Sequence, residues 1–197
     1  MKKIVTAICL AMAMLAGSVF AAEKKDIGMY GKLTIGYATI TYSENDYKLD
    51  FSHFELAPAF GLTNLFPLPN FGIEGFCNLD FGGKSWGIVE FQSIMVVPGA
   101  RAVWAPPISF FSGKTGTWQD QLIPYAGAGF SIPIAFYEVK SRYLDEKYNE
   151  TKVYFDGEFQ LGCRWAFDEH WAVLAENNFA FGGLFKYSFN AGAIYNF

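Results

Sequence analysis

The sequence predicts an all-β protein, an eight-stranded antiparallel up-and-down β-barrel that crosses a membrane. Apolar and polar residues alternate along eight segments, and this period of two is typical of strands, whose successive side chains point to opposite faces. The composition is 19% aromatic and only 17% charged. A soluble barrel would need a more charged exterior, so the apolar face is predicted to point outward into lipid.

The first 21 residues are predicted to form a secretory signal peptide. Lys2 and Lys3 provide a basic start, the apolar run over residues 4–17 is too short to span a membrane, and a small-residue cleavage site ends at Ala21. Residues 22–197 are then expected to form one domain, the barrel. A buried N-terminal helix is the alternative reading of the apolar run.

The mature chain is predicted to be acidic. Cleavage would remove 2 of the 15 Lys and Arg residues and none of the 19 Asp and Glu residues, which leaves a net charge of 13 − 19 = −6. This balance, without a basic patch, argues against a nucleic-acid partner. Cys77 and Cys163 fall on apolar strand faces. Two unpaired thiols are therefore expected, with a disulfide as the alternative.

Turn signals separate the eight strand segments. In chain order the segments span residues 28–42, 51–62, 71–81, 87–104, 124–139, 153–167, 171–181 and 184–197. Between them we expect polar loops at 43–48 and 140–151, a proline-rich turn at 63–70, tight turns at 82–85, 168–170 and 182–183, and a longer connection at 105–122.

The fourth segment is the least regular. Glu90 and Gln92 have one parity and Arg101 has the other, which predicts a bulge near Pro98 and Gly99. The surrounding stretch, residues 94–111, is strongly apolar, but its prolines and Arg101 argue against a membrane-spanning helix.

Three further features favour a lipid-facing exterior. The polar faces mix charges with Gly, Ala and Ser, which would fit the narrow interior of an eight-stranded barrel. Each segment is at least as long as the roughly 9–11 residues with which a tilted strand crosses the hydrocarbon. Aromatic residues gather near segment ends, as in the interfacial girdles of membrane barrels: Tyr30, Tyr42, Trp86, Trp104, Tyr125, Tyr137, Trp165, Trp171, Tyr195 and Phe197.

In lipid, every backbone N–H and C=O group must be paired within the protein. The strands are therefore expected to close into a barrel in which the last strand pairs with the first. The last segment supports this expectation, because its aromatic and polar residues alternate as far as the C-terminal Phe197.

Three stretches, "PYAGAG" at 124–129, "LGCRWAFDEHWAVLAE" at 161–176 and "GAIYNF" at 192–197, carry a family resemblance. With them the mature chain resembles the small outer-membrane barrels of the OmpX/OmpW-like group. The resemblance implies a monomer in the outer membrane, surrounded by its lipid. It also implies contacts with the barrel-assembly machinery and periplasmic chaperones during biogenesis, with Tyr195 and Phe197 as the C-terminal assembly signal. The short outer turns at 82–85 and 182–183 depart from the long loops of many members and weaken any inference of loop-mediated adhesion.

The sequence contains no pattern that predicts an enzyme, a cofactor or a metal site. His53 and Ser52 are neighbours on one strand and should point to opposite faces, so they cannot act as a nucleophile–base pair. The polar faces instead predict a network of charges in the lumen. Its members are Lys32, Glu55, Glu74, Asp80, Asp156, Glu158, Arg164, Glu176 and Lys186, with a pair expected between Arg164 and Glu176.

Such a network has two interpretations. Paired charges could fill the narrow interior, because buried charge must be paired, or they could line a pore. We expect an integral outer-membrane barrel with a structural, membrane-maintenance role. The alternatives are a narrow channel for small or hydrophobic solutes, a lipid-modifying enzyme, and a secreted soluble barrel that binds a lipophile.

Overall fold

The computed structural model describes residues 27–44, 47–65, 70–86, 89–113, 115–116, 118–141 and 147–197. The expected signal peptide and its cleavage site lie outside these ranges. Neither of the two helices in the described ranges has the length and apolar character needed to cross a bilayer. In chain order the elements are β1 (Gly28–Glu44), β2 (Tyr47–Thr63), β3 (Phe71–Trp86), β4 (Val89–Trp104), α2 (Ile108–Ser112), α3 (Trp118–Gln121), β5 (Leu122–Ser131), β6 (Ile134–Ser141), β7 (Lys147–Val153), β8 (Asp156–Ala166), β9 (Trp171–Gly182) and β10 (Phe185–Asn196).

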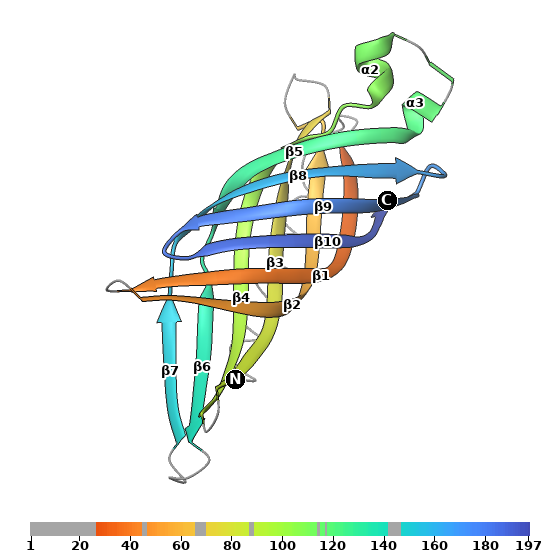
Figure 1. Ribbon diagram of the computed structural model, residues 1–197. Coiled ribbons are helices and arrows are strands. Elements are labelled where there is room, and N and C mark those ends of the chain that lie inside the picture. The colour runs from red at the N-terminus through yellow and green to blue at the C-terminus, as the bar shows by residue number, and fades with distance from the viewer. Residues whose placement is uncertain are drawn as a thin grey trace.

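The strands close into the predicted eight-stranded antiparallel barrel (Figure 1). The wall runs from β1 through β2, β3 and β4 to the β5/β6 strand, then through β7/β8, β9 and β10 back to β1. β5 and β6 count as one barrel strand because both pair with β4 in a single register, with Gly99 opposite Ser131 and Val96 opposite Ile134. Pro133 interrupts the ladder between them, since proline has no N–H to donate.

The closing seam joins the two ends of the barrel. β1 pairs with β10 from Tyr30 opposite Asn196 to Thr41 opposite Phe185. The N–H of Phe197 donates to the carbonyl of Met29 at 3.0 Å, and the Phe197 ring lies 5.2 Å from that of Tyr195. The C-terminal aromatic residue is therefore part of the barrel, as the alternation predicted.

The polar loop predicted at 140–151 is wrong in part, because β7 forms within it. β7 pairs with β6 from Ile134 opposite Val153 to Lys140 opposite Lys147. The predicted tight turn at 82–85 also lies inside a strand, since β3 continues to Trp86. The pairing of β2 with β3 ends at His53 and Gly82, and the later residues of β3 have no partner on β2. β3, β4, β6 and β7 therefore continue past the closed wall as a sheet that we call the extension (Figure 1).

The bulge predicted in β4 is absent. Its register against β3 is continuous from Trp104 opposite Phe71 to Val89 opposite Trp86. Gln92 has the outward parity and is exposed, whereas Arg101 has the inward parity and is buried. The outward face of the extension tolerates polar residues because this sheet stands beyond the apolar belt of the barrel. The opposite end holds Gly28 and Phe197, and we call it the terminal end.

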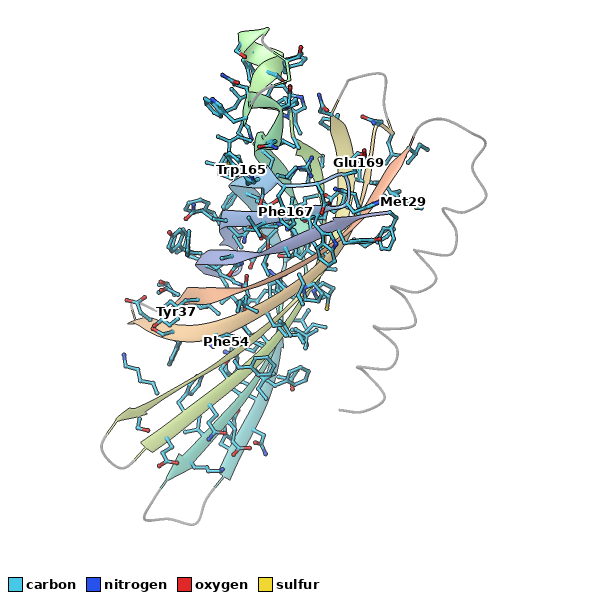
Figure 2. All side chains as sticks on the ribbon, turned by 90° about the vertical axis from the view of Figure 1, so that its right-hand side faces the viewer. Met29, Tyr37, Phe54, Trp165, Phe167 and Glu169 are labelled. Carbon is cyan, nitrogen blue, oxygen red and sulfur yellow. The ribbon has the colours of Figure 1, made fainter. Side chains whose placement is uncertain are left out.

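The outside of the barrel is apolar, and the charged side chains of its spanning strands point inside. Leu33 and Ile35 on β1 are each 53% exposed, whereas Glu55 and Asp80 are fully buried. Figure 2 shows Tyr37 and Phe54 on the outside of the wall. A soluble barrel has the opposite arrangement, so this surface fits lipid.

The predicted aromatic girdle needs one correction. Tyr30, Tyr125 and Tyr137 point into the barrel and are buried. Tyr30 and Tyr125 donate hydrogen bonds to carboxylates in the lumen, which is why they face inward. Trp104, Trp165, Trp171 and Phe197 do lie on the outside, and the side chains of Tyr42 and Trp86 fall outside the described residues. Cys77 and Cys163 form no disulfide with each other, as predicted.

We predict that Ile35→Arg destabilises the barrel, because Arg at mid-membrane on the lipid face costs about 2–4 kcal/mol. The matched control is Gln92→Arg, which adds the same charge to the outward face of the extension and should change stability by less than about 0.5 kcal/mol. Urea unfolding in phospholipid bilayers measures both. Equal stabilities would contradict the membrane position assigned to β1.

Candidate functional site

The candidate site is the lumen, which has two layers. Near the terminal end, buried polar side chains cross the interior. Towards the extension, the interior also contains a layer of apolar side chains. All the predicted network residues occupy inward-facing positions on their strands. Arg164 is partly exposed. The others are buried, with exposures below 9%: Lys32, Glu55, Glu74, Asp80, Asp156, Glu158, Glu176 and Lys186.

Two carboxylates form the centre of the polar layer. Glu74 on β3 accepts hydrogen bonds from Lys32 Nζ at 2.8 Å and from Tyr30 Oη at 2.9 Å. Glu176 on β9 accepts from Lys32 Nζ at 3.1 Å and from Tyr125 Oη at 2.7 Å. Lys32 thus joins opposite walls of the barrel through ion pairs that are almost completely shielded from solvent. We call this group the Glu74–Glu176 cluster; it also includes Arg101, Gln160 and Asn178.

Arg101 ties β4 to this cluster. Its Nε donates to Glu74 at 2.7 Å, and one terminal nitrogen donates to Asn178 at 3.3 Å. The guanidinium carbon lies 4.4 Å from the centroid of the Phe76 ring, in cation–π geometry. The guanidinium and the Glu74 carboxylate therefore neutralise each other inside the barrel, as buried charges must.

Glycines on β5 make room for Arg101. A Cβ atom on Gly129 would lie 2.7 Å from the Cβ of Arg101 and 2.1 Å from the carbonyl oxygen of Ala100. On Gly127 it would meet Arg101 Cδ at 3.4 Å. The small residues on the polar face of the fifth predicted segment thus serve the packing of a large cation on the neighbouring strand.

A second group lies nearer the extension, the Lys186 cluster, formed by Lys186, Glu55 and Asp80. Lys186 Nζ contacts Asp80 at 2.8 Å and also pairs with Glu55. Glu55 in addition accepts a hydrogen bond from Ser188 Oγ at 3.2 Å. One lysine of β10 therefore holds carboxylates from β2 and β3.

The remaining predicted residues are held differently. Glu158 accepts from Ser131 Oγ at 2.6 Å. Asp156 accepts the backbone N–H groups of Gly183 at 2.6 Å and Leu184 at 3.1 Å, and so fixes the β9–β10 turn. That turn needs glycine, because Gly182 has a φ of 150°.

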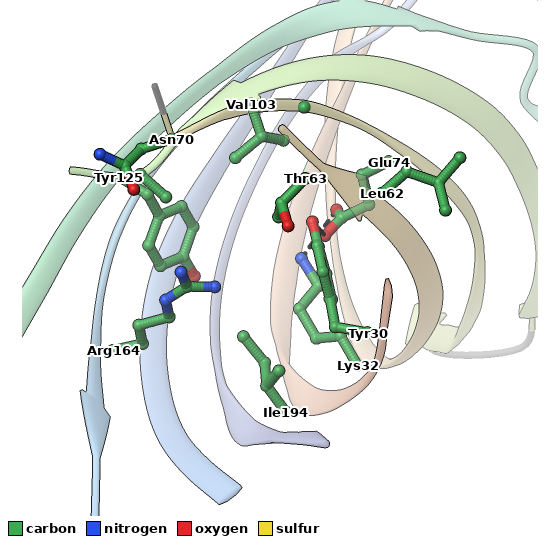
Figure 3. A pocket seen from close by; sticks show the side chains of 12 residues that line it. Tyr30, Lys32, Leu62, Thr63, Asn70, Glu74, Val103, Tyr125, Arg164 and Ile194 are labelled. Carbon is green, nitrogen blue, oxygen red and sulfur yellow. Dashed lines mark hydrogen bonds and ion pairs between the residues drawn. The ribbon is translucent and has the colours of Figure 1, made fainter. Parts of the chain in front are cut away.

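The expected pair between Arg164 and Glu176 is not formed. Arg164 is opposite Leu174, whereas Glu176 is opposite Gly162, so the two lie at different depths. Glu176 forms its ion pair with Lys32 instead. Among the described residues Arg164 has no hydrogen bond or ion pair, and it lies beside Tyr125 at a cavity of about 20 Å³ (Figure 3). That volume holds about one water molecule.

The apolar layer was not anticipated from the sequence. Its buried members are Ile40, Phe76, Met95, Val97, Ala135, Tyr137 and Leu184. The ring of Phe91 links the walls, with its centroid 4.5 Å from that of Phe51 and 5.5 Å from that of Tyr137. The inward parity that Met95 and Val97 share with Arg101 was the available signal.

A groove lies on the outside of this layer, where the β9–β10 turn meets the β1–β2 hairpin. It has a volume of about 580 Å³ and is lined by Thr41, Asp50, Phe181, Gly182, Gly183, Leu184 and Phe185. Thr41 Oγ1 donates to Asp50 at 2.7 Å. Leu184 belongs to both the groove and the buried apolar layer.

The histidines show no catalytic geometry. His53 is buried in the lumen and Ser52 is exposed on the outer face, so the structure keeps them apart. His170 Nδ1 lies 3.0 Å from the carbonyl oxygen of Asn196, and its ring stacks on Tyr195. Within the described part of the chain, no three His, Cys, Asp or Glu side chains are grouped so that they could hold a metal ion.

Comparison with known proteins places this geometry among small membrane barrels. No protein-family model and no curated protein matches the chain. Among solved structures, Neisserial surface protein A matches with a TM-score of 0.59 and 12% identity over 88% of this chain and 100% of that chain. OprG from Pseudomonas aeruginosa matches with a TM-score of 0.54 and 12% identity over 86% of this chain and 96% of that chain. Ail, the attachment invasion locus protein of Yersinia pestis, matches with a TM-score of 0.52 and 16% identity over 85% of this chain and 98% of that chain.

At these identities the likeness shows the fold alone. It confirms the predicted architecture, that of the small outer-membrane β-barrels. The narrower resemblance to the OmpX/OmpW-like group stays a prediction.

We predict that Glu74→Ala lowers the free energy of unfolding by about 3–5 kcal/mol, because it leaves Lys32 and Arg101 without a buried partner. The matched control is Glu138→Ala, which removes the partly exposed carboxylate that Lys140 contacts at 2.7 Å on the extension. Exposed pairs contribute about 0–1 kcal/mol. Urea unfolding in bilayers compares the two, and equally small losses would show that the cluster does not stabilise the barrel.

Proposed function

We propose that the protein is an integral outer-membrane barrel with a structural, membrane-maintenance role and a lumen closed to ions. The observation that carries this proposal is the Glu74–Glu176 cluster, which joins β1, β3, β4 and β9 across the interior. Eight strands leave an interior that side chains can fill. Breaking these pairs to admit ions would strand buried charges, which favours a closed lumen.

The proposal includes the setting of the barrel. Outer-membrane lipid is its surrounding partner, which the exposed Leu33, Ile35 and Phe189 support. The chain functions as a monomer and is inserted by the barrel-assembly machinery after transit with periplasmic chaperones. Tyr195 and Phe197 serve as the assembly signal; their position at the seam, where Phe197 bonds to Met29, supports that role. The protein is not an enzyme, and it uses no cofactor.

The test is single-channel recording in planar bilayers. We expect no steady current from the wild type. Arg101→Ala should conduct, because Gly127 and Gly129 leave the vacated space unfilled. Lys140→Ala, which removes a cation from the extension, is the control and should stay closed. Retarded migration of unboiled protein on a mild-detergent gel checks that each variant is folded. Steady conductance by the wild type would reject the closed lumen.

A second candidate function is a narrow passage for hydrophobic solutes. It is favoured by the apolar layer of the lumen and by the groove outside it, which share Leu184. A small apolar molecule seated in the groove would contact Phe181 and Phe185 and would lie next to the buried layer. This function is compatible with a lumen that blocks ions, because no residue of the Glu74–Glu176 cluster lines the groove.

If this passage operates, Thr41→Trp should reduce uptake of an apolar fluorescent probe into protein-containing vesicles, because the indole would fill the groove. Thr151→Trp is the control, since it places the same side chain on the exposed surface of β7. Equal uptake by the wild type, both variants and protein-free vesicles would dismiss the passage.

A further inference from the structure

The connection between β4 and β5 is unlike the other two connections at the terminal end. It runs over residues 105–121, whereas the others cover residues 64–70 and 167–170. It contains α2 and α3, and Figure 1 shows it projecting from the ends of β4 and β5. A turn of a few residues would suffice to join antiparallel neighbours, so its length needs a separate explanation.

This connection exposes large aromatic side chains. Phe110 is 54% exposed, Phe111 is 62% exposed and Trp118 is 53% exposed. Fully burying a Phe side chain contributes about 1.5–3 kcal/mol, so leaving three aromatic side chains in water is unfavourable. The rings of Phe110 and Phe111 lie 5.3 Å apart, and α3, which carries Trp118, lies against α2. Exposed apolar groups that gather in this way mark an interaction surface. We call Phe110, Phe111 and Trp118 the aromatic patch.

The aromatic patch continues the lipid-facing surface of the barrel. Trp104, the last residue of β4, faces outward, and its ring lies 6.4 Å from that of Phe110 and 6.0 Å from that of Phe111 in edge-to-face geometry. On the other side, α3 leads directly into β5, whose Leu122 is opposite the outward-facing Trp165. The patch therefore joins the belt of exposed aromatic residues at the terminal end on both sides.

Charge and backbone geometry also suit the membrane interface. α2 contains no charged residue. The charged residue of α3, Asp120, accepts the backbone N–H of Gly116 and so closes the loop between the helices. Gly113 ends α2 with a φ of 67°, and its N–H donates to the Ser109 carbonyl at 2.8 Å. The chain can thus turn back towards the barrel with its aromatic side chains on the outside.

We propose that the α2–α3 connection is an interfacial anchor that places the aromatic patch among the phospholipids of the leaflet at the terminal end. Aromatic side chains favour the headgroup region, where the ring is apolar and the surroundings are partly hydrated. In α2, the N–H of Phe110 donates to the Pro107 carbonyl and the N–H of Gly113 donates to the Ser109 carbonyl, which leaves fewer unpaired backbone groups at that depth. The anchor rests on the membrane position of the barrel, but it does not depend on whether the lumen conducts.

The experiment uses a spin label at Ser112→Cys, beside Phe111, in the mature barrel with Cys77 and Cys163 replaced by Ala. The protein is placed in vesicles of phosphatidylcholine and phosphatidylglycerol. Collisions with oxygen, which concentrates in lipid, are compared with collisions with a water-soluble nickel chelate. Ile35→Cys on the lipid face and Gln92→Cys on the extension provide the lipid and water references.

We expect the oxygen-to-nickel ratio at Ser112 to lie nearer the Ile35 value than the Gln92 value. It should fall to the Gln92 value when Phe110→Ser and Phe111→Ser are introduced, while the two reference ratios stay unchanged. A ratio at Ser112 equal to that at Gln92 in the parent protein would overturn the anchor. So would a label shielded from both reagents, because a second protein copy would then cover the patch. A water-like ratio at Ile35 would instead reject the membrane position of the barrel.

Discussion

Closure of the barrel wall is the constraint on which the rest of the structure depends. Hydrocarbon offers no partner to a backbone N–H or C=O group, so every membrane-spanning strand needs a neighbour on both sides. The pairing of β1 with β10 along their length supplies the last of these neighbours. Because the seam uses the final residues, the backbone N–H of Phe197 is tied to Met29, while its side chain lies on the outside of the barrel.

Closure also decides where the charges go. A closed wall has only two faces, and its outer face is taken by lipid, so the polar side chains of each spanning strand are buried in a narrow lumen. There they must be paired. Lys32 satisfies this requirement by contacting both Glu74 and Glu176, and Arg101 does so through Glu74 and Asn178. The same contacts that make burial possible fill the interior, which links stability to the closed lumen.

Much of this fold could be predicted from alternation alone. The eight barrel strands, the outward-facing apolar side chains and the seam follow from a period of two combined with the pairing requirement. The network residues were found by the same parity rule. Arg101 was missed because its parity differs from that of Glu90 and Gln92, a difference that was explained by a bulge. The register is continuous, and Gln92 is exposed on the extension, where the outward face is not covered by lipid. Alternation identifies two faces, but it does not say at which residue the lipid ends.

Partners within the lumen could not be derived from the sequence either. Whether Glu176 meets Arg164 on the next strand or Lys32 from β1 depends on the depth of each residue and on the reach of its side chain. The register places Arg164 nearer the terminal end than Glu176. Tyr30 and Tyr125 resemble girdle residues in the sequence, and only the carboxylates opposite them explain why they face inward.

The strands of the barrel end at different distances from the terminal end, and this difference bears on both candidate functions. Asp156 holds the β9–β10 turn through the N–H groups of Gly183 and Leu184. The neighbouring strands β1 and β2 continue past this turn, away from the terminal end. At this step Leu184 lines the outer groove and also packs in the buried apolar layer. The ion pairs of Lys32 and Arg101 lie nearer the terminal end, where Arg101 packs on Phe76 of the apolar layer. A structure arranged in this way can exclude ions at one depth and still present an apolar surface at another, so closure to ions and contact with a hydrophobic solute are separate properties of the same barrel.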